Sequence, residues 1–266
     1  MWAVCMSWDK GRALLCWIAA ALFAALGIAG GSALYLRFLN GTENLLAVYV
    51  LNAAQQVFTF ALPALMILHA RPGRWQRFRQ RCALPHWHTL CFGALLAVTA
   101  TVVISMVAGM WSVFLEKAVG YTAEAQTLPK ATNFGQWVLA VLAVAVIPAL
   151  CEELFFRGLL QSLLCVRLPR GGVWIAALLF GAAHFRWEAF PALVLLGVVL
   201  GAGYNRHGYW GSALLHALYN AAVLVLSACE LQISVITMVL FVAAFCFVLR
   251  GYLEKEEPDE TDSSGL

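Results

Sequence analysis

The chain has 266 residues, of which 62% are hydrophobic and only 12% are charged. A soluble domain contains about twice that share of charged residues, and the polar helix faces that a large soluble helical protein needs are missing here. Composition therefore excludes a soluble globular protein. The net charge of +3 adds little, because in a membrane protein the placement of the positive residues matters more than their sum.

Apolar stretches of about 20 residues recur along the whole chain, which is the length needed to cross roughly 30 Å of hydrocarbon. We therefore predict an all-α, polytopic helical membrane protein with about eight transmembrane helices. The expected spans are 13–36, 45–70, 90–115, 136–150 with a polar continuation, 173–185, 189–204, 210–229 and 231–249. The first stretch is too long for a secretory signal peptide, so it is expected to be a retained span.

Positive residues gather before the first expected span and after the second, fourth, sixth and eighth spans. The densest group follows the second span, in the run "RPGRWQRFRQR". The positive-inside rule then places both termini in the cytoplasm. We expect a multi-pass protein of the bacterial inner membrane that binds membrane lipid and no nucleic acid.

The stretch "PALCEELFFRGLL" (148–160) places three charged residues inside the fourth apolar region. Each charge near the centre of a membrane helix costs about 2.5–3.5 kcal/mol. Glu153 and Arg157 are four residues apart, so they share a helix face and can form an ion pair. Glu152 is turned by about 100° from Glu153 and has no basic partner at helical spacing. It is therefore a candidate functional residue.

Two further spans contribute polar residues. His184 follows Phe180 by four residues in the fifth span, and His216 precedes Asn220 by four in the seventh. A single intramembrane histidine more often forms an interhelical hydrogen bond than acts as a catalyst. However, a carboxylate pair, a histidine and a His-xxx-Asn pair on three spans all need partners in hydrocarbon, which favours their convergence. Their depths, at 1.5 Å per residue, permit one cavity that opens to the cytoplasmic side.

Such a cavity suits the hydrolysis of an acyl bond, most plausibly a peptide bond. A glutamate activates water as general base, a histidine shares the proton transfer, and an imidazole and an amide donate hydrogen bonds to a developing oxyanion. The GxSxG and HExxH motifs are both absent. An ion-coupled transporter is a rival hypothesis, but inverted repeats and paired broken helices are not evident. A non-enzymatic membrane scaffold or immunity protein on the same fold is the other alternative.

The order Glu-Glu-xxx-Arg, Phe-xxx-His, His-xxx-Asn on successive spans resembles the CPBP intramembrane proteases (CAAX proteases and bacteriocin-processing enzymes), which include the Rce1-like CAAX prenyl endopeptidases and the bacterial Abi proteins. The resemblance implies an endopeptidase in which Glu152 and His184 activate water. It implies that His216 and Asn220 form the oxyanion site and that Glu153 and Arg157 orient it. The implied substrate is a peptide or membrane protein, which in this family can be lipidated.

The resemblance also suggests a division of the chain. Residues 1–130 are expected to shape the substrate groove, residues 131–250 to form the catalytic membrane core, and residues 251–266 to form an acidic, disordered tail. Spacing alone does not decide whether a metal takes part. Glu152, His184 and His216 would be the ligands of Zn²⁺ or another divalent metal. We favour a metal-free mechanism that requires no cofactor, because the His216–Asn220 pair suits an oxyanion site better than a ligand set.

Overall fold

The structure is a computed structural model, which describes residues 15, 18–20, 22, 24–31, 44–70, 72–122, 131–169, 171–229 and 234–254. Much of the first expected span and residues 255–266 of the acidic tail lie outside these residues. All regular elements in the described ranges are helices. They are α2 (Leu45–Gln56), η1 (Val57–Ala61), α3 (Leu62–His69), α4 (Pro72–Gln80), α5 (Trp87–Val119), α6 (Phe134–Ala140), η2 (Val141–Val146), α7 (Ile147–Glu153), η3 (Leu154–Gln161), α8 (Ser162–Arg167), α9 (Gly172–Ala183), η4 (Trp187–Ala189), α10 (Phe190–Cys229) and α11 (Val235–Leu253).

Several of these elements join end to end into long membrane helices. Within the described residues, five helical stretches are long and apolar enough to cross a membrane, and two apolar helices, Ile18–Gly31 and Gly172–Ala183, are shorter. The five are Leu45–His69, Trp87–Val119, Phe134–Val166, Trp187–Cys229 and Ile236–Leu253. The prediction of an all-α, multi-pass membrane protein is therefore confirmed.

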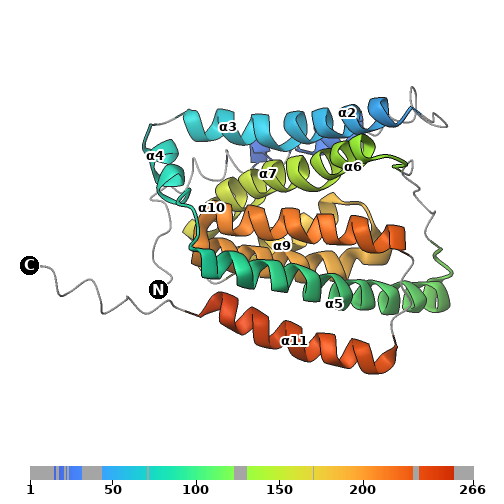
Figure 1. Cartoon of the computed structure of the whole chain (residues 1–266). Coiled ribbons are helices and arrows are strands. Elements are labelled where there is room, and N and C mark those ends of the chain that lie inside the picture. The colour runs from blue at the N-terminus through green and yellow to red at the C-terminus, as the bar shows by residue number, and fades with distance from the viewer. Residues whose placement is uncertain are drawn as a thin grey trace, which may run out of the picture.

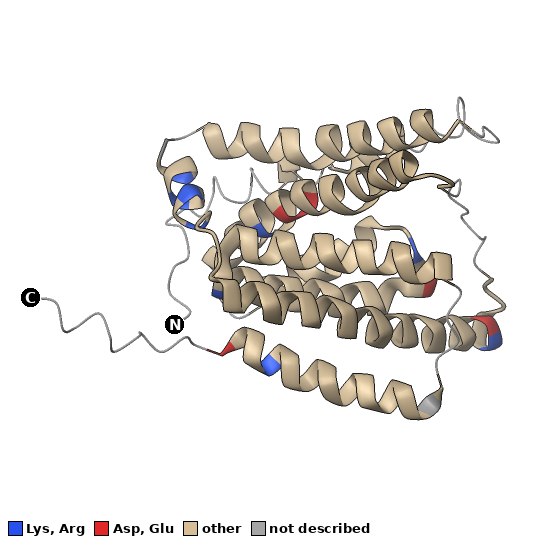
Figure 2. Cartoon of the chain, in the orientation of Figure 1, with Lys and Arg blue, Asp and Glu red and all other residues tan. Residues whose placement is uncertain are grey.

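The helices lie side by side in one bundle (Figure 1). From one edge to the other the order is α2–α3, then α6–α7, then α9 and α10, then α5, and finally α11. Arginines gather on α4 at one end of the bundle, whereas the acidic residues of α7 lie well inside the length of the helices (Figure 2). The charged residues of α7 are thus surrounded by protein, at the place where α10 packs against α7 and α9.

The long α10 consists of two arms joined at Gly208, where the backbone leaves the helical conformation. The Ser212 Oγ atom lies 2.9 Å from the carbonyl oxygen of Leu200. Residues 12 apart in a straight helix are about 18 Å apart, so residues 190–207 and 209–229 must run antiparallel. The two arms correspond to the expected spans 189–204 and 210–229, so the predicted division into two helices is present.

The turn between the arms depends on glycine. Gly208 has φ 74° and ψ −164°, a backbone conformation that is almost restricted to glycine. A Cβ atom at this position would lie 2.3 Å from the carbonyl oxygen of Arg81. The same oxygen accepts a hydrogen bond of 2.7 Å from the N–H of Tyr209. The connection between α4 and α5 is therefore held directly against the α10 turn.

Helix α9 ends earlier than the sequence suggests. The expected span 173–185 places His184 inside a helix, but α9 ends at Ala183 and His184 is its C-cap. Phe185 then takes a positive φ of 52°, which turns the chain away from the helix axis. Twelve residues span only about 18 Å, less than the hydrocarbon thickness. His184 consequently lies at a helix end, where it is partly exposed.

Replacement of Gly208 tests the role of this turn. We expect Gly208→Ala to lower the free energy of unfolding by at least about 3 kcal/mol, because the new methyl group adds a clash with Arg81 to the backbone strain. Gly120 has a positive φ of 69° in the milder left-handed helical region and has open space around it, so Gly120→Ala adds backbone strain without a clash and should cost about 1 kcal/mol. Thermal unfolding in detergent measures both, and equal losses in the two variants would contradict the contact with Arg81.

Candidate functional site

The structure brings five of the six predicted site residues into contact, or close to it, inside the bundle. Glu152 and Glu153 end α7, Arg157 lies in η3, His184 caps α9, and His216 lies in the second arm of α10. Burial increases toward the centre of the group: the side chain of His184 is 28% exposed, that of Glu152 6%, and that of Glu153 0%. Three segments far apart in sequence therefore form one polar cluster in an apolar surrounding.

Glu153 is the centre of this cluster. Its Oε1 accepts hydrogen bonds from Arg157 Nη1 at 2.7 Å and from His216 Nδ1 at 2.9 Å. Its Oε2 accepts from the Ser212 hydroxyl at 2.5 Å. A fully buried carboxylate is tolerated only when its charge is paired and its lone pairs are hydrogen-bonded. Both oxygen atoms of Glu153 meet that requirement, and the predicted Glu153–Arg157 ion pair is present.

Arg157 connects the carboxylate to two further helices. Its Nη2 donates a hydrogen bond of 3.1 Å to the carbonyl of Gly197 in the first arm of α10. Its guanidinium lies 4.5 Å from the centre of the Phe180 ring of α9, within the range of a cation–π contact. Gly197 allows α9 to come this close, because a Cβ there would lie 2.9 Å from the Cα of Ala177. One buried cation thus fixes the relative positions of α9, η3 and α10.

Glu152 differs sharply from its neighbour. Its Oε2 lies 3.9 Å from His184 Nε2 and 3.9 Å from His216 Nε2, which is too long for a hydrogen bond. This oxygen is buried and has no hydrogen-bond partner within the described part of the chain. Polar atoms at such a separation are commonly bridged by a water molecule. The arrangement therefore suits a small polar group held between one carboxylate and two imidazoles.

The partners of the two imidazoles define which nitrogen holds the proton. His184 Nδ1 lies 2.7 Å from the carbonyl of Phe180, and His216 Nδ1 lies 2.9 Å from the Glu153 carboxylate. Since both oxygens accept, both Nδ1 atoms must donate. A neutral imidazole then presents the lone pair of Nε2, and in both residues that atom is the one nearest Glu152. In both histidines Nε2 therefore faces Glu152.

The Asn220 side chain is not held by a hydrogen bond from any described residue. It follows His216 by one helical turn, is half-buried, and has no hydrogen-bond partner in the residues that the structure describes. Its amide N–H groups are therefore available to an acceptor that arrives in the site. Its participation in an oxyanion site remains a prediction.

Sequence reasoning missed Ser212, which binds the second oxygen of Glu153. A signal was present, because Ser212, His216 and Asn220 follow one another at intervals of four and share one face of the helix. The contact with the carbonyl of Gly197 was not predictable in this way, because every residue has a backbone carbonyl and the sequence does not show which one accepts.

The donor atoms do not form a metal-ligand set in the arrangement that the structure describes. Ligands of one tetrahedral Zn²⁺, bound at about 2.0–2.2 Å, lie about 3.3 Å from one another. Glu152 lies 3.9 Å from each histidine. Among the described residues no group of three or more His, Cys, Asp or Glu side chains meets the geometry of a metal site.

The buried ion pair makes a testable prediction about stability. We expect Arg157→Met to lower the free energy of unfolding by about 3–5 kcal/mol, because it leaves the Glu153 charge buried without its cation. Adding Glu153→Gln to that variant removes the unpaired charge and should recover about 1–2 kcal/mol. Thermal unfolding of the purified protein measures both variants.

A matched control is available in the exposed pair Arg250–Glu254, which has the same spacing and the same 2.7 Å separation. Arg250→Met should cost less than about 0.5 kcal/mol, because water already solvates both groups. If the double variant were less stable than Arg157→Met alone, the compensation argument would be wrong.

Comparison with known proteins agrees with the order of the motifs. Residues 134–222 match the family model described as type II CAAX prenyl endopeptidase Rce1-like. Neither the curated proteins nor the solved structures gave a match. The matched segment includes the five residues of the cluster and also Asn220. Over this segment, about a third of the chain, the protein is similar to the Rce1-like CAAX prenyl endopeptidases.

Proposed function

We propose that the protein is an intramembrane endopeptidase that hydrolyses a peptide bond with a water molecule activated by Glu152. One observation supports this most strongly: Glu152 Oε2 is buried, has no hydrogen-bond partner among the described residues, and lies 3.9 Å from the Nε2 atoms of two histidines. A structural carboxylate would be saturated with donors, as Glu153 is. An unsaturated one at this depth suits a water molecule and then a reacting carbonyl group.

In the proposed reaction Glu152 accepts a proton from the water while His184 Nε2 accepts the second hydrogen bond. The water oxygen attacks the peptide carbonyl carbon, and the carbonyl π electrons move to its oxygen. The tetrahedral intermediate then collapses as its C–N bond breaks. The proton held by Glu152 passes to the leaving amine nitrogen, which yields a carboxylic acid and an amine.

The oxyanion is assigned to His216 and Asn220. A His216 that is protonated on both nitrogens donates from Nδ1 to Glu153 and from Nε2 to the oxyanion. The Asn220 amide supplies a second donor from the next helical turn. Glu153, Arg157 and Ser212 do not contact the reacting atoms in this scheme. They hold His216 in the orientation that the donation requires.

The family provides the first substrate class to test, a peptide with a prenylated C-terminal motif. Membrane-helix peptides are the second class. We propose that the arginine-rich end of the bundle, where α4 lies, faces the cytoplasm of a bacterial cell and that both termini lie on that side.

Cleavage assays on the purified protein test the proposed roles. With a fluorogenic farnesylated peptide or a membrane-helix peptide as substrate, Glu152→Gln should lower the rate by about 10²–10⁴-fold, because the general base is lost. Asn220→Ala should lower it by about 10²–10³-fold through the loss of one oxyanion donor. Glu116→Gln, at an exposed glutamate of α5, is the matched control and should cleave at the wild-type rate. Cleavage by Glu152→Gln at the wild-type rate would overturn the assignment of Glu152 as general base. An unchanged phenotype of cells that carry Glu152→Gln would favour a non-enzymatic scaffold.

We also propose that the reaction needs no metal ion. Dialysis against a strong chelator should leave the cleavage rate unchanged within about twofold, because protein groups alone supply the base and the oxyanion donors. The measurement compares chelated protein with the same sample after addition of Zn²⁺. Loss of cleavage on chelation with recovery on Zn²⁺ would contradict the proposal and assign Glu152, His184 and His216 as ligands.

A further inference from the structure

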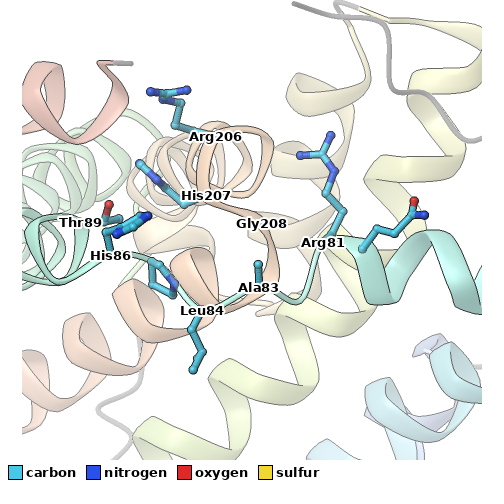
Figure 3. A pocket seen from close by; sticks show the side chains of 10 residues that line it. Arg81, Ala83, Leu84, His86, Thr89, Arg206, His207 and Gly208 are labelled. Carbon is cyan, nitrogen blue, oxygen red and sulfur yellow. The ribbon is translucent and has the colours of Figure 1, made fainter. Parts of the chain in front are cut away.

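A second polar site lies at the end of the bundle, away from the glutamates of α7. A cavity of about 390 Å³ is formed by the α4–α5 connection, the start of α5 and the turn of α10 (Figure 3). In Figure 3 the side chains of His86, Thr89, Arg206 and His207 lie on one side of it and Arg81 on the other, with Ala83 between them. A cavity of this size is typical of a small-molecule site.

The charge of the cavity is positive and is not neutralised within the described residues. Arg81 Nη1 donates a hydrogen bond to the carbonyl of Asn205 at 3.1 Å, and Arg206 donates from Nε to the carbonyl of Glu254 at 2.9 Å. These acceptors carry no net charge. Neither arginine pairs with a carboxylate in the part of the chain that the structure describes. The Glu254 carboxylate accepts instead from Arg250 at 2.7 Å.

The two arginines remain only half-buried, and each has N–H donors that the carbonyl contacts do not use. Guanidinium groups bind phosphate oxygens through paired N–H donors, which makes arginine the preferred residue for phosphate recognition. The His86 imidazole lines the same cavity and is a hydrogen-bonding group of the type that phosphate oxygens require. Thr89 and His207 also line it, but both make contacts within the protein, His207 through Nε2 with the carbonyl of Tyr252. The positive charge and the hydrogen-bonding groups of the cavity therefore favour binding of an anion with several oxygen atoms.

The surroundings of the cavity indicate the source of that anion. Leu84, in the loop that lines it, is 76% exposed, and Trp87, at the start of the α5 membrane helix, is 66% exposed. Exposed tryptophan at the end of a membrane helix is typical of the level of the lipid headgroups. Basic pockets between membrane helices at the cytoplasmic surface are sites for anionic headgroups. A phospholipid whose phosphate is bound by the arginines would thus place its acyl chains beside Leu84 and Trp87.

We propose that this cavity is a binding site for a phosphate group, supplied by an anionic phospholipid, with Arg81 and Arg206 as the principal ligands. A bound headgroup would connect the α4–α5 loop to the α10 turn, which already meet where Tyr209 N–H donates to the Arg81 carbonyl. The site is separate from the proposed catalytic cluster, and its existence does not depend on proteolysis.

Native mass spectrometry of the full chain in detergent tests this site. The probes are dioctanoylphosphatidylglycerol, dioctanoylphosphatidylcholine and inorganic phosphate. Wild type should bind the glycerol lipid at least about tenfold more tightly than the choline lipid, and Arg81→Gln and Arg206→Gln should each weaken it by about tenfold. Because both arginines also bind backbone carbonyls, Ala83→Glu provides a second variant. It places a negative charge in the cavity from an exposed position that makes no such contact, and it should abolish the preference for the glycerol lipid.

Matched controls come from α4, outside the cavity. Gln76→Glu adds the same charge as Ala83→Glu, and Arg79→Gln removes the same charge as the arginine variants, both at exposed positions. Both controls should bind the glycerol lipid as wild type does. Equal affinity for the two lipids, or wild-type binding by Ala83→Glu, would overturn the proposal. Competition by inorganic phosphate as effective as that of the lipid would retain the phosphate site but overturn the lipid as its source.

Discussion

The structure depends on one constraint, the burial of a carboxylate among membrane helices. Glu153 is completely inaccessible to solvent, and an unpaired charge there would be too costly to retain. Arg157, from the same helix, supplies the opposite charge. Ser212 and His216, from the second arm of α10, supply hydrogen bonds to the carboxylate. Arg157 in turn requires the carbonyl of Gly197 from the first arm. The α10 hairpin must therefore close against α7 in one register.

A second contact repeats this arrangement one turn further along. Gln161 follows Arg157 by four residues, and its Nε2 donates to the carbonyl of Gly201 and to Asn205 Oδ1. Gly197, Gly201 and Asn205 are themselves spaced by four. Two helices with matching intervals thus exchange polar contacts along one face. Glu152 Oε2 and Gln161 Oε1 are both buried without a hydrogen-bond partner among the described residues, and of the two it is Glu152 Oε2 that lies beside two imidazoles.

Much of this could be predicted from local spacing, because residues four apart share a helix face whatever the helix packs against. The Glu153–Arg157 pair followed in this way, whereas the two helices 189–204 and 210–229 were predicted from the length of their apolar stretches. Contacts between helices did not, since spacing within a helix says nothing about its neighbours. The link from Arg157 to Gly197, the position of His184 at a helix end, and the meeting of Arg81 with Gly208 all depend on long-range packing. The expectation that residues 1–130 shape a substrate groove remains untested.

The central claim is that two adjacent glutamates have different tasks: Glu153 holds the helices together and Glu152 performs the chemistry. The most direct test measures the unfolding temperature and the peptide cleavage rate on the same preparations of Glu152→Gln and Glu153→Gln. We expect Glu152→Gln to unfold within a few degrees of wild type but not to cleave, and Glu153→Gln to lose both stability and cleavage. A Glu152→Gln protein that is as destabilised as Glu153→Gln, or a Glu153→Gln protein as stable as wild type, would contradict this division.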